Sequence, residues 1–122
     1  MDRVIQIVED DADIRFIVEY VLEDASYKVE SFESAKAFLN RSNKENVALV
    51  ILDVMLPDGS GIDLSKSMKQ GSDTHSIPVI IMSAHAASDI AISEGAADGF
   101  IQKPFDIDHF IKQVKQFINS KA

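Results

Sequence analysis

Apolar and polar positions follow two rhythms along this chain. Short runs of consecutive apolar residues predict strands that a sheet buries on both faces, and Val47 to Leu52 is the longest such run. Between these runs, apolar residues recur every three or four positions, which is typical of amphipathic helices. The pattern predicts five repeats of a strand followed by a helix. The predicted strands are residues 4–8, 27–32, 47–52, 77–82 and 99–102, and the predicted helices include residues 14–22, 34–40, 62–69, 87–94 and 107–118.

Three of the predicted helices carry an apolar stripe that we expect to face the sheet. Asp11 or Asp13 is expected to cap the first helix, because a carboxylate accepts hydrogen bonds from free N–H groups at a helix start. The predicted inward positions are Ile14, Ile17, Val18, Val21 and Leu22 in the first helix, Ala35, Phe38 and Leu39 in the second, and Ile107, Phe110, Ile111, Val114, Phe117 and Ile118 in the last.

Alternation of strands and helices indicates an α/β fold with a parallel sheet and helices on both faces. Right-handed crossovers leave few topologies for five strands, and a doubly wound sheet is the natural one. The run from Pro57 to Gly61 is predicted to be a loop by its turn residues. A chain of 122 residues is expected to form a single domain, here over residues 1–122.

Composition narrows the function classes. The sequence has no cysteine, which excludes disulfides and thiolate metal sites within it. Its net charge of −8 argues against direct binding to nucleic acid, whose phosphates attract basic surfaces. No apolar run approaches the roughly 20 residues of a membrane helix, and the first residues lack the apolar core of a signal peptide. We therefore expect a cytoplasmic protein that binds neither membranes nor nucleic acid directly.

Residues that can carry chemistry follow the predicted strands. Ligands of open parallel sheets bind at the carboxyl ends of the strands, so residues far apart in sequence are expected to meet there. After the first strand come Glu9, Asp10 and Asp11, after the third Asp53, after the fourth Ser83, and after the fifth Lys103.

Clustered carboxylates repel one another, and a hard cation with oxygen ligands relieves the repulsion. Mg²⁺ is the cation expected here, with Asp10 and Asp53 as direct ligands, Glu9 acting through water, and a backbone carbonyl in the following loop as a further oxygen. Lys103 supplies a compact positive charge for a phosphoryl group, and Ser83 supplies a hydroxyl. An aspartate nucleophile needs no general base, because a carboxylate with a pKa near ~3.9 is already ionised at neutral pH.

Several polar and aromatic residues have ordinary structural explanations. Asp11 suits a helix cap better than a metal site. Phe105 suits the core, and His75 and His109 suit the surface. His85, just past the fourth strand, is expected near the mouth of the site.

Four segments, taken in order, resemble the receiver domains of bacterial two-component response regulators. The resemblance covers essentially the whole chain, and the four segments together are a specific signal. It implies a flavodoxin-like strand order of 2-1-3-4-5 and a phosphorylation-dependent switch. The segments are IQIVEDD at residues 5–11, LDVMLPDGSG at 52–61, IPVIIMSA at 77–84 and GAADGFIQKPF at 95–105.

The resemblance implies a role for each site residue. By this resemblance, Asp53 is the phosphoacceptor, Asp10 is the metal-ligating acid, and Glu9 is its acidic neighbour. Met55 is the residue whose backbone carbonyl completes the metal site. Ser83 is the switch hydroxyl, Phe100 is the aromatic switch, and Lys103, followed by an often cis-bonded Pro104, is the family's lysine. Three positions depart from the commonest family residue. Glu9 replaces aspartate, Ser83 replaces threonine, and Phe100 replaces tyrosine and so lacks a hydroxyl partner.

The implied function is a signalling switch and not an enzyme, although a receiver promotes its own phosphorylation and dephosphorylation. The implied partners are a histidine kinase or histidine phosphotransfer protein, which donates the phosphoryl group, and a downstream effector protein or domain. The resemblance implies that the effector is reached through the face of the fourth helix, fifth strand and fifth helix. Formation of a homodimer is left open.

Two other functions fit parts of the pattern. A Mg²⁺-dependent phosphatase of the haloacid-dehalogenase type would also use an aspartyl phosphate, but such enzymes usually carry a second acid two residues after the nucleophile. That position is Met55 in this sequence. A pseudo-receiver that acts only as an interaction module typically lacks the acids or the lysine, and this chain has them.

Overall fold

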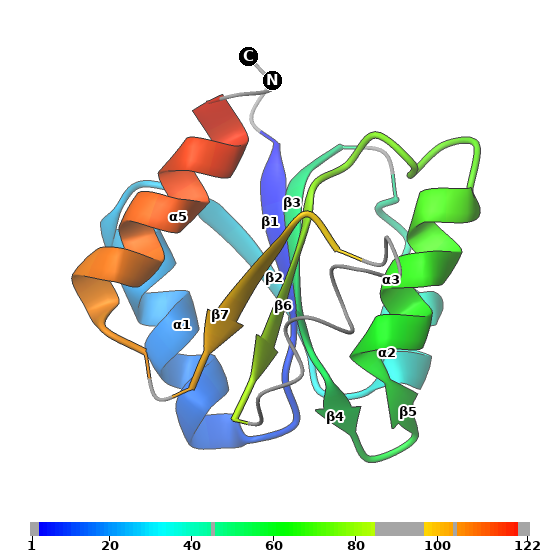
Figure 1. The fold of residues 1–122 in the computed structure, drawn as a ribbon, viewed down its shortest axis with the longest axis horizontal. Coiled ribbons are helices and arrows are strands. Elements are labelled where there is room, and N and C mark those ends of the chain that lie inside the picture. Colours follow the sequence, from blue (N-terminus) through cyan, green and yellow to red (C-terminus); the bar gives the residue numbers. More distant parts are fainter. Residues whose placement is uncertain (1–2, 45, 85–96, 104, 120–122) are drawn as a thin grey trace.

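The computed structural model describes residues 3–44, 46–84, 97–103 and 105–119. Five parallel strands form one sheet in the order β2-β1-β3-β6-β7, which confirms the predicted doubly wound topology. Helices α1 and α5 cover one face of the sheet, and α2 and α3 cover the other (Figure 1). The elements are β1 Val4–Val8, α1 Ala12–Asp24, β2 Lys28–Phe32, α2 Ala35–Leu39, β3 Val47–Asp53, β4 Met55–Leu56, β5 Gly59–Ser60, α3 Gly61–Gln70, β6 Val79–Ser83, β7 Gly99–Gln102 and α5 Ile107–Asn119.

The central strand β3 explains why the apolar run beginning at Val47 forms a strand here. Successive side chains of a strand point to opposite faces, so Leu49 and Ile51 enter one core while Val50 and Leu52 enter the other. All seven residues of β3 are buried. Two hydrophobic cores therefore hold the layers together, one beneath α1 and α5 and one beneath α2 and α3.

Helix ends follow the expected capping chemistry. Asp11 caps α1, because its side chain accepts hydrogen bonds from the backbone N–H groups of Asp13 and Ile14. Asp13 itself lies in the first turn and is not the cap.

The helix predicted over residues 87–94 lies outside the described residues. No helix in the described parts of the chain is both long and apolar enough to span a membrane.

Three of the predicted inward side chains are exposed, and for these the prediction was wrong. Ile17, Leu39 and Ile107 are exposed to 45%, 52% and 49%. Ile17 and Ile107 line the groove between α1 and α5, where no other element of the described residues covers them. Leu39 is the last residue of a five-residue helix, which is too short to bury a full stripe. The other predicted inward positions are buried or packed against a core.

The predicted loop between Pro57 and Gly61 overlaps a small antiparallel hairpin. Strands β4 and β5 pair Met55 with Ser60 and Leu56 with Gly59. The hairpin lies at the edge of the sheet where the strands end (Figure 1). The end of the hairpin lies against the residue that precedes it. A Cβ atom on Gly61 would lie only 2.1 Å from the carbonyl oxygen of Asp53. Only glycine allows this close approach of two backbones.

Candidate functional site

Three carboxylates meet where strands β1 and β3 end. One carboxylate oxygen from each of Glu9, Asp10 and Asp53 lies within 4.8 Å of the others. Glu9 is fully buried, Asp53 is exposed to only 8%, and Asp10 is exposed to solvent. They line a hollow of about 300 Å³ together with Asp11, Ile14, Met55, Ser83, Ala84 and Lys103. The structure thus brings together the acids, the hydroxyl residue and the lysine that the sequence placed after four different strands.

Lys103 lies between two of the carboxylates. Its Nζ is 2.5 Å from Glu9 Oε1 and 3.2 Å from Asp53 Oδ2. Its backbone N–H donates to the carbonyl oxygen of Ser83 at 2.8 Å, which ties the end of β7 to the end of β6. The lysine therefore arrives from the edge of the sheet with its charge directed inward.

Burial dominates the electrostatics of Glu9. Loss of solvent and the nearby Asp53 raise the pKa of Glu9 to about 7, and Lys103 offsets only part of this. Burial lowers the pKa of Lys103, but the hydrogen bond and charge of Glu9 and the charge of Asp53 outweigh it, so the pKa of Lys103 is raised. A buried acid beside two other acids is a site at which added positive charge stabilises the ionised form.

The loop that carries Glu9 and Asp10 is held from α1. Nη1 of Arg15 donates to the carbonyl oxygen of Glu9 at 2.7 Å and lies 3.5 Å from that of Asp10. The backbone N–H of Asp11 donates to Glu9 Oε2 at 3.3 Å. Sequence reasoning missed Arg15, because its role depends on where the first turn of α1 points and no local motif reveals this.

The other side of Asp53 contacts the hairpin. Its Oδ1 accepts a hydrogen bond from the backbone N–H of Met55 at 3.3 Å. The Met55 side chain is exposed to 63%, at the rim of the hollow. The Met55 backbone therefore contacts the Asp53 carboxylate, and Met55 also lines the same hollow.

The remaining predicted positions fall into four groups. Ser83 is buried and lines the hollow, whereas Phe100 is partly buried and packs against the core beneath α2 and α3. Phe105 packs against the other core and stacks on Phe110, as expected for a core residue. The surface positions of His75 and His109 are confirmed. His85 and Pro104 lie outside the described residues.

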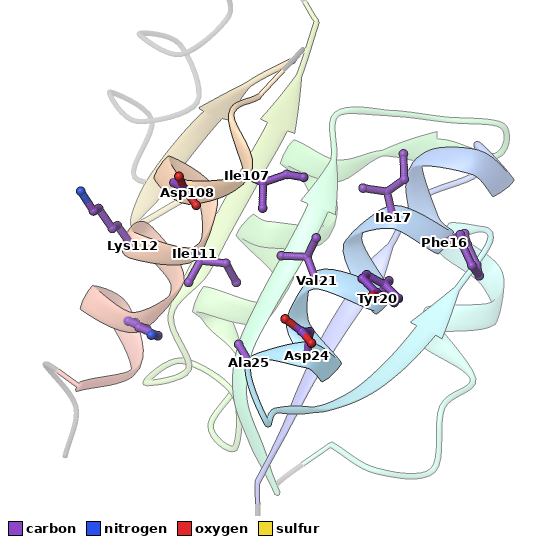
Figure 2. A pocket seen from close by; sticks show the side chains of 11 residues that line it. Phe16, Ile17, Tyr20, Val21, Asp24, Ala25, Ile107, Asp108, Ile111 and Lys112 are labelled. Carbon is purple, nitrogen blue, oxygen red and sulfur yellow. The ribbon is translucent and has the colours of Figure 1, made fainter.

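A larger apolar groove lies between α1 and α5. It has a volume of about 850 Å³, and Figure 2 shows Val21 of α1 and Ile111 of α5 pointing into the space between the helices. Phe16 and Tyr20 of α1 are exposed to 66% and 63%. A second hollow, lined by Ile14, Ile17, Ala84, Lys103, Phe105 and Ile107, shares residues with both this groove and the carboxylate hollow. An apolar surface therefore runs from the carboxylate site along α1 and α5.

The donor set suits a hard divalent cation. Three carboxyl groups stand against one lysine charge, and hard cations prefer such oxygen ligands. The oxygens of a phosphoryl group carry negative charge, and Lys103 and a bound cation could neutralise this charge together. The arrangement can therefore combine a carboxylate nucleophile, a cation and a lysine at one point.

Comparison of sequences gives a family and its relatives. A family model described as the response regulator receiver domain matches residues 5–115. The phosphate regulon transcriptional regulatory protein PhoB of Escherichia coli (strain K12) is 36% identical over 117 residues, which cover 94% of this chain and 51% of PhoB. The DNA-binding transcriptional regulator NtrC of Proteus hauseri is 34% identical over 115 residues, which cover 92% of this chain and 24% of NtrC. The chain thus spans about half of PhoB and a quarter of NtrC.

Comparison of structures agrees with the sequence relatives. The non-phosphorylated HemR receiver domain of Leptospira biflexa has a TM-score of 0.85 at 28% identity, covering 96% of this chain and 94% of its own. The response regulator TrrA of Thermotoga maritima, solved in complex with Mg²⁺-BeF, has a TM-score of 0.83 at 26% identity, covering 96% and 99%. Together with the strand order and the family match, these similarities show that the chain belongs to the response regulator receiver domain family.

Proposed function

We propose that this chain is a phosphorylation switch whose phosphoacceptor is Asp53. The observation that carries the proposal is the position of Asp53 at the end of β3, with Lys103 Nζ 3.2 Å from its carboxylate and two further acids within 4.8 Å. A carboxylate oxygen of Asp53 attacks the phosphorus of a phosphohistidine. The new O–P bond forms as the N–P bond breaks, and the electron pair of that bond returns to the imidazole of the donor.

The proposed metal is Mg²⁺. Asp10 and Asp53 would be its direct carboxylate ligands, Glu9 would act through water, and the backbone carbonyl of Met55 would add an oxygen. Bound Mg²⁺ would neutralise charge on the phosphoryl oxygens. The carboxylate cluster and the similarity to TrrA, which was solved with Mg²⁺-BeF, support this assignment.

The other site residues act on the phosphoryl group or report it. Lys103 contacts a phosphoryl oxygen, and the hydroxyl of Ser83 donates to another. Movement of Ser83 would allow Phe100 to change its position. The signal would leave through the face of the helix predicted over residues 87–94, β7 and α5. An effector protein or domain receives it. The single receiver domain over residues 1–122 and the cytoplasmic location stay predictions.

The proposed phosphoryl donor is a histidine kinase or histidine phosphotransfer protein. It docks along the apolar surface between α1 and α5, because this surface is continuous with the carboxylate hollow through Ile14 and Ile17. The exposed rings of Phe16 and Tyr20 offer the large apolar contacts that protein interfaces favour. A phosphatase is the weaker alternative, since Met55 occupies the position where such an enzyme carries its second acid.

Phosphorylation with a small donor tests the chemical step. The chain is incubated with Mg²⁺ and acetyl phosphate, and the modified peptide is mapped. We expect phosphate on Asp53 only, with labelling lost in Asp53→Asn and in the presence of a chelator. Phosphate on another residue, or undiminished labelling of Asp53→Asn, would refute the assignment.

Donor docking needs a separate test. Two variants, Tyr20→Asp and Leu39→Asp, are each phosphorylated by two donors: acetyl phosphate, and a phosphorylated histidine kinase that labels the wild-type chain. Leu39→Asp is the control, because it places the same charge on an exposed apolar position of α2. We expect Tyr20→Asp to slow transfer from the kinase while acetyl phosphate labels it normally. Equal kinase rates for the two variants would contradict docking between α1 and α5.

A further inference from the structure

The hairpin after Asp53 is anchored at its tip by a contact with a different element. Asp58 lies in the turn between β4 and β5, and its side chain crosses to the start of α2. Oδ1 accepts a hydrogen bond from the backbone N–H of Ala35, and Oδ2 accepts one from that of Lys36, both at 2.9 Å. These two bonds hold the ionised carboxylate, so the pKa of Asp58 lies below its usual range.

The base of the same hairpin is part of the carboxylate site. The backbone N–H of Gly61 donates to the carbonyl oxygen of Val54 at 2.9 Å, and that of Met55 donates to Asp53 Oδ1 at 3.3 Å. The backbone of Gly61 also lies directly against that of Asp53. Any tilt of the hairpin about its base would therefore move the amide and carbonyl groups that surround the Asp53 carboxylate.

The middle of the hairpin offers few other restraints. Leu56 is buried in the core beneath α2 and α3, but Met55 and Asp58 are exposed. A Cβ atom on Gly59 would lie 3.5 Å from Cβ of Ala35, which is ordinary contact and shows that α2 lies alongside the hairpin. Asp58 thus links the hairpin tip to α2 through polar contacts.

Helix capping alone does not account for the geometry. Ser34 already caps α2, because its Oγ accepts a hydrogen bond from the backbone N–H of Ala37 at 3.1 Å. A short helix of five residues gains a second, charged cap from a residue 23 positions away from Ala35. Two hydrogen bonds to one planar carboxylate also fix the orientation of the hairpin tip relative to α2, which a single bond would not do.

We infer that Asp58 is a positioning residue for the phosphoacceptor site: its paired contact with α2 fixes the hairpin and so places the backbone of Met55 beside Asp53. The inference rests on the proposed function, since it concerns the Mg²⁺ and phosphoryl chemistry of that site. Asp58 itself touches neither the metal nor the phosphoryl group.

The test measures Mg²⁺ affinity by titration calorimetry on the folded full chain, together with the amide resonance of Met55 and stability to denaturant. Asp58→Ala removes both contacts. Asp58→Glu keeps the charge but moves the carboxylate one methylene further from the hairpin. Ser34→Ala is the matched control, because it weakens the cap of α2 without touching the hairpin. Asp63→Asn removes a neighbouring exposed acid and controls for charge.

We expect Asp58→Ala and Asp58→Glu to weaken Mg²⁺ binding by about tenfold, the lower end of what outer partners of a metal site contribute, and to shift the Met55 amide. Ser34→Ala and Asp63→Asn should leave both unchanged. Loss of stability in the Asp58 variants with wild-type Mg²⁺ affinity would overturn the inference and leave Asp58 as a cap. If Asp58→Ala does not fold, Asp58→Glu decides alone. Failure of the proposed function is distinct, because the wild-type chain would then bind no Mg²⁺ at Asp53.

Discussion

The ammonium group of Lys103 lies 2.5 Å from a carboxylate oxygen of Glu9, a side chain that solvent does not reach. The same ammonium is 3.2 Å from Asp53. A single lysine therefore compensates two buried acids, in the place where we propose that Mg²⁺ and a phosphoryl group bind. A bound Mg²⁺ would share the neutralisation of this carboxylate cluster with Lys103, so the sign of the effect of one cation on the other can be predicted.

Replacement of Lys103 by alanine should separate metal binding from phosphoryl transfer. Loss of a nearby cation leaves more negative charge for Mg²⁺. Two unit charges about 4 Å apart interact by roughly 1 kcal/mol even in bulk water, so Mg²⁺ should bind at least about fivefold more tightly. Phosphorylation by acetyl phosphate should slow on the order of a hundredfold, because a group that stabilises charge in the transition state is gone. Calorimetry and a phosphorylation time course measure the two effects. A parallel loss of both would mean that Lys103 mainly maintains the shape of the site.

Glu9 should make stability depend on pH in the absence of metal. Its pKa is 4.5 in the ordinary state and about 7 in the fold, so between these values the folded chain holds a proton that the unfolded chain releases. The free energy of unfolding should therefore fall as pH rises through this window, by at most about 3 kcal/mol, and level off above it.

Denaturant titrations from acid to neutral pH check this expectation, with Glu9→Gln as the reference. The unfolding free energy of the wild type should fall relative to that of Glu9→Gln as pH rises, because only the wild type carries the titrating carboxyl group. Mg²⁺ should weaken the trend, because a divalent cation favours the ionised carboxylate. A wild type that instead gains stability relative to Glu9→Gln as pH rises would show that Lys103 holds Glu9 ionised in the fold.

The sequence predicted the meeting of Glu9, Asp10, Asp53 and Lys103 because one rule of parallel sheets brings strand ends to a common edge. Their pairing was not predicted, since Lys103 was assigned to a phosphoryl group and its contact with Glu9 depends on side-chain geometry. The contact of Asp58 with α2 was missed for a similar reason. It joins two turns whose relative position only the assembled layers determine.

Apolar periodicity also reached a limit in the helices. It predicted that Ile17 and Ile107 face the core, because both lie on a stripe with truly buried residues. Periodicity gives the direction in which a side chain points but not whether another layer lies there. Both side chains point between α1 and α5, and the resulting exposed groove is information that only the packing of the helices supplies.

Two glycines of the hairpin should respond very differently to alanine. A Cβ atom at residue 61 would meet the carbonyl oxygen of Asp53 at 2.1 Å, whereas one at residue 59 would make an ordinary contact of 3.5 Å with Ala35. Gly61→Ala should therefore destabilise the fold by about 1–3 kcal/mol or more and reduce phosphorylation, while Gly59→Ala changes little. Denaturant unfolding and acetyl phosphate labelling provide the measurements. Similar costs for both variants would contradict the close approach of the backbone to Asp53.

The exposed side chain of Met55 should lengthen the lifetime of the aspartyl phosphate. Hydrolysis requires water to attack the phosphorus in line with the bond to Asp53. Met55 lies at the rim of the carboxylate hollow and is exposed to 63%. A flexible apolar side chain can cover a phosphoryl group without activating water. Met55→Ala should speed loss of phosphate by a factor of about two to ten, equivalent to roughly 1 kcal/mol of activation free energy.

Met55→Leu is the control, because it keeps the apolar cover and should stay near the wild-type rate. Mg²⁺ affinity should not change in either variant, because the proposed metal ligand is the backbone carbonyl of Met55. Decay of purified phosphoprotein after removal of the donor gives the rate. An unchanged or slower decay in Met55→Ala would refute shielding and place control of the water elsewhere around the hollow.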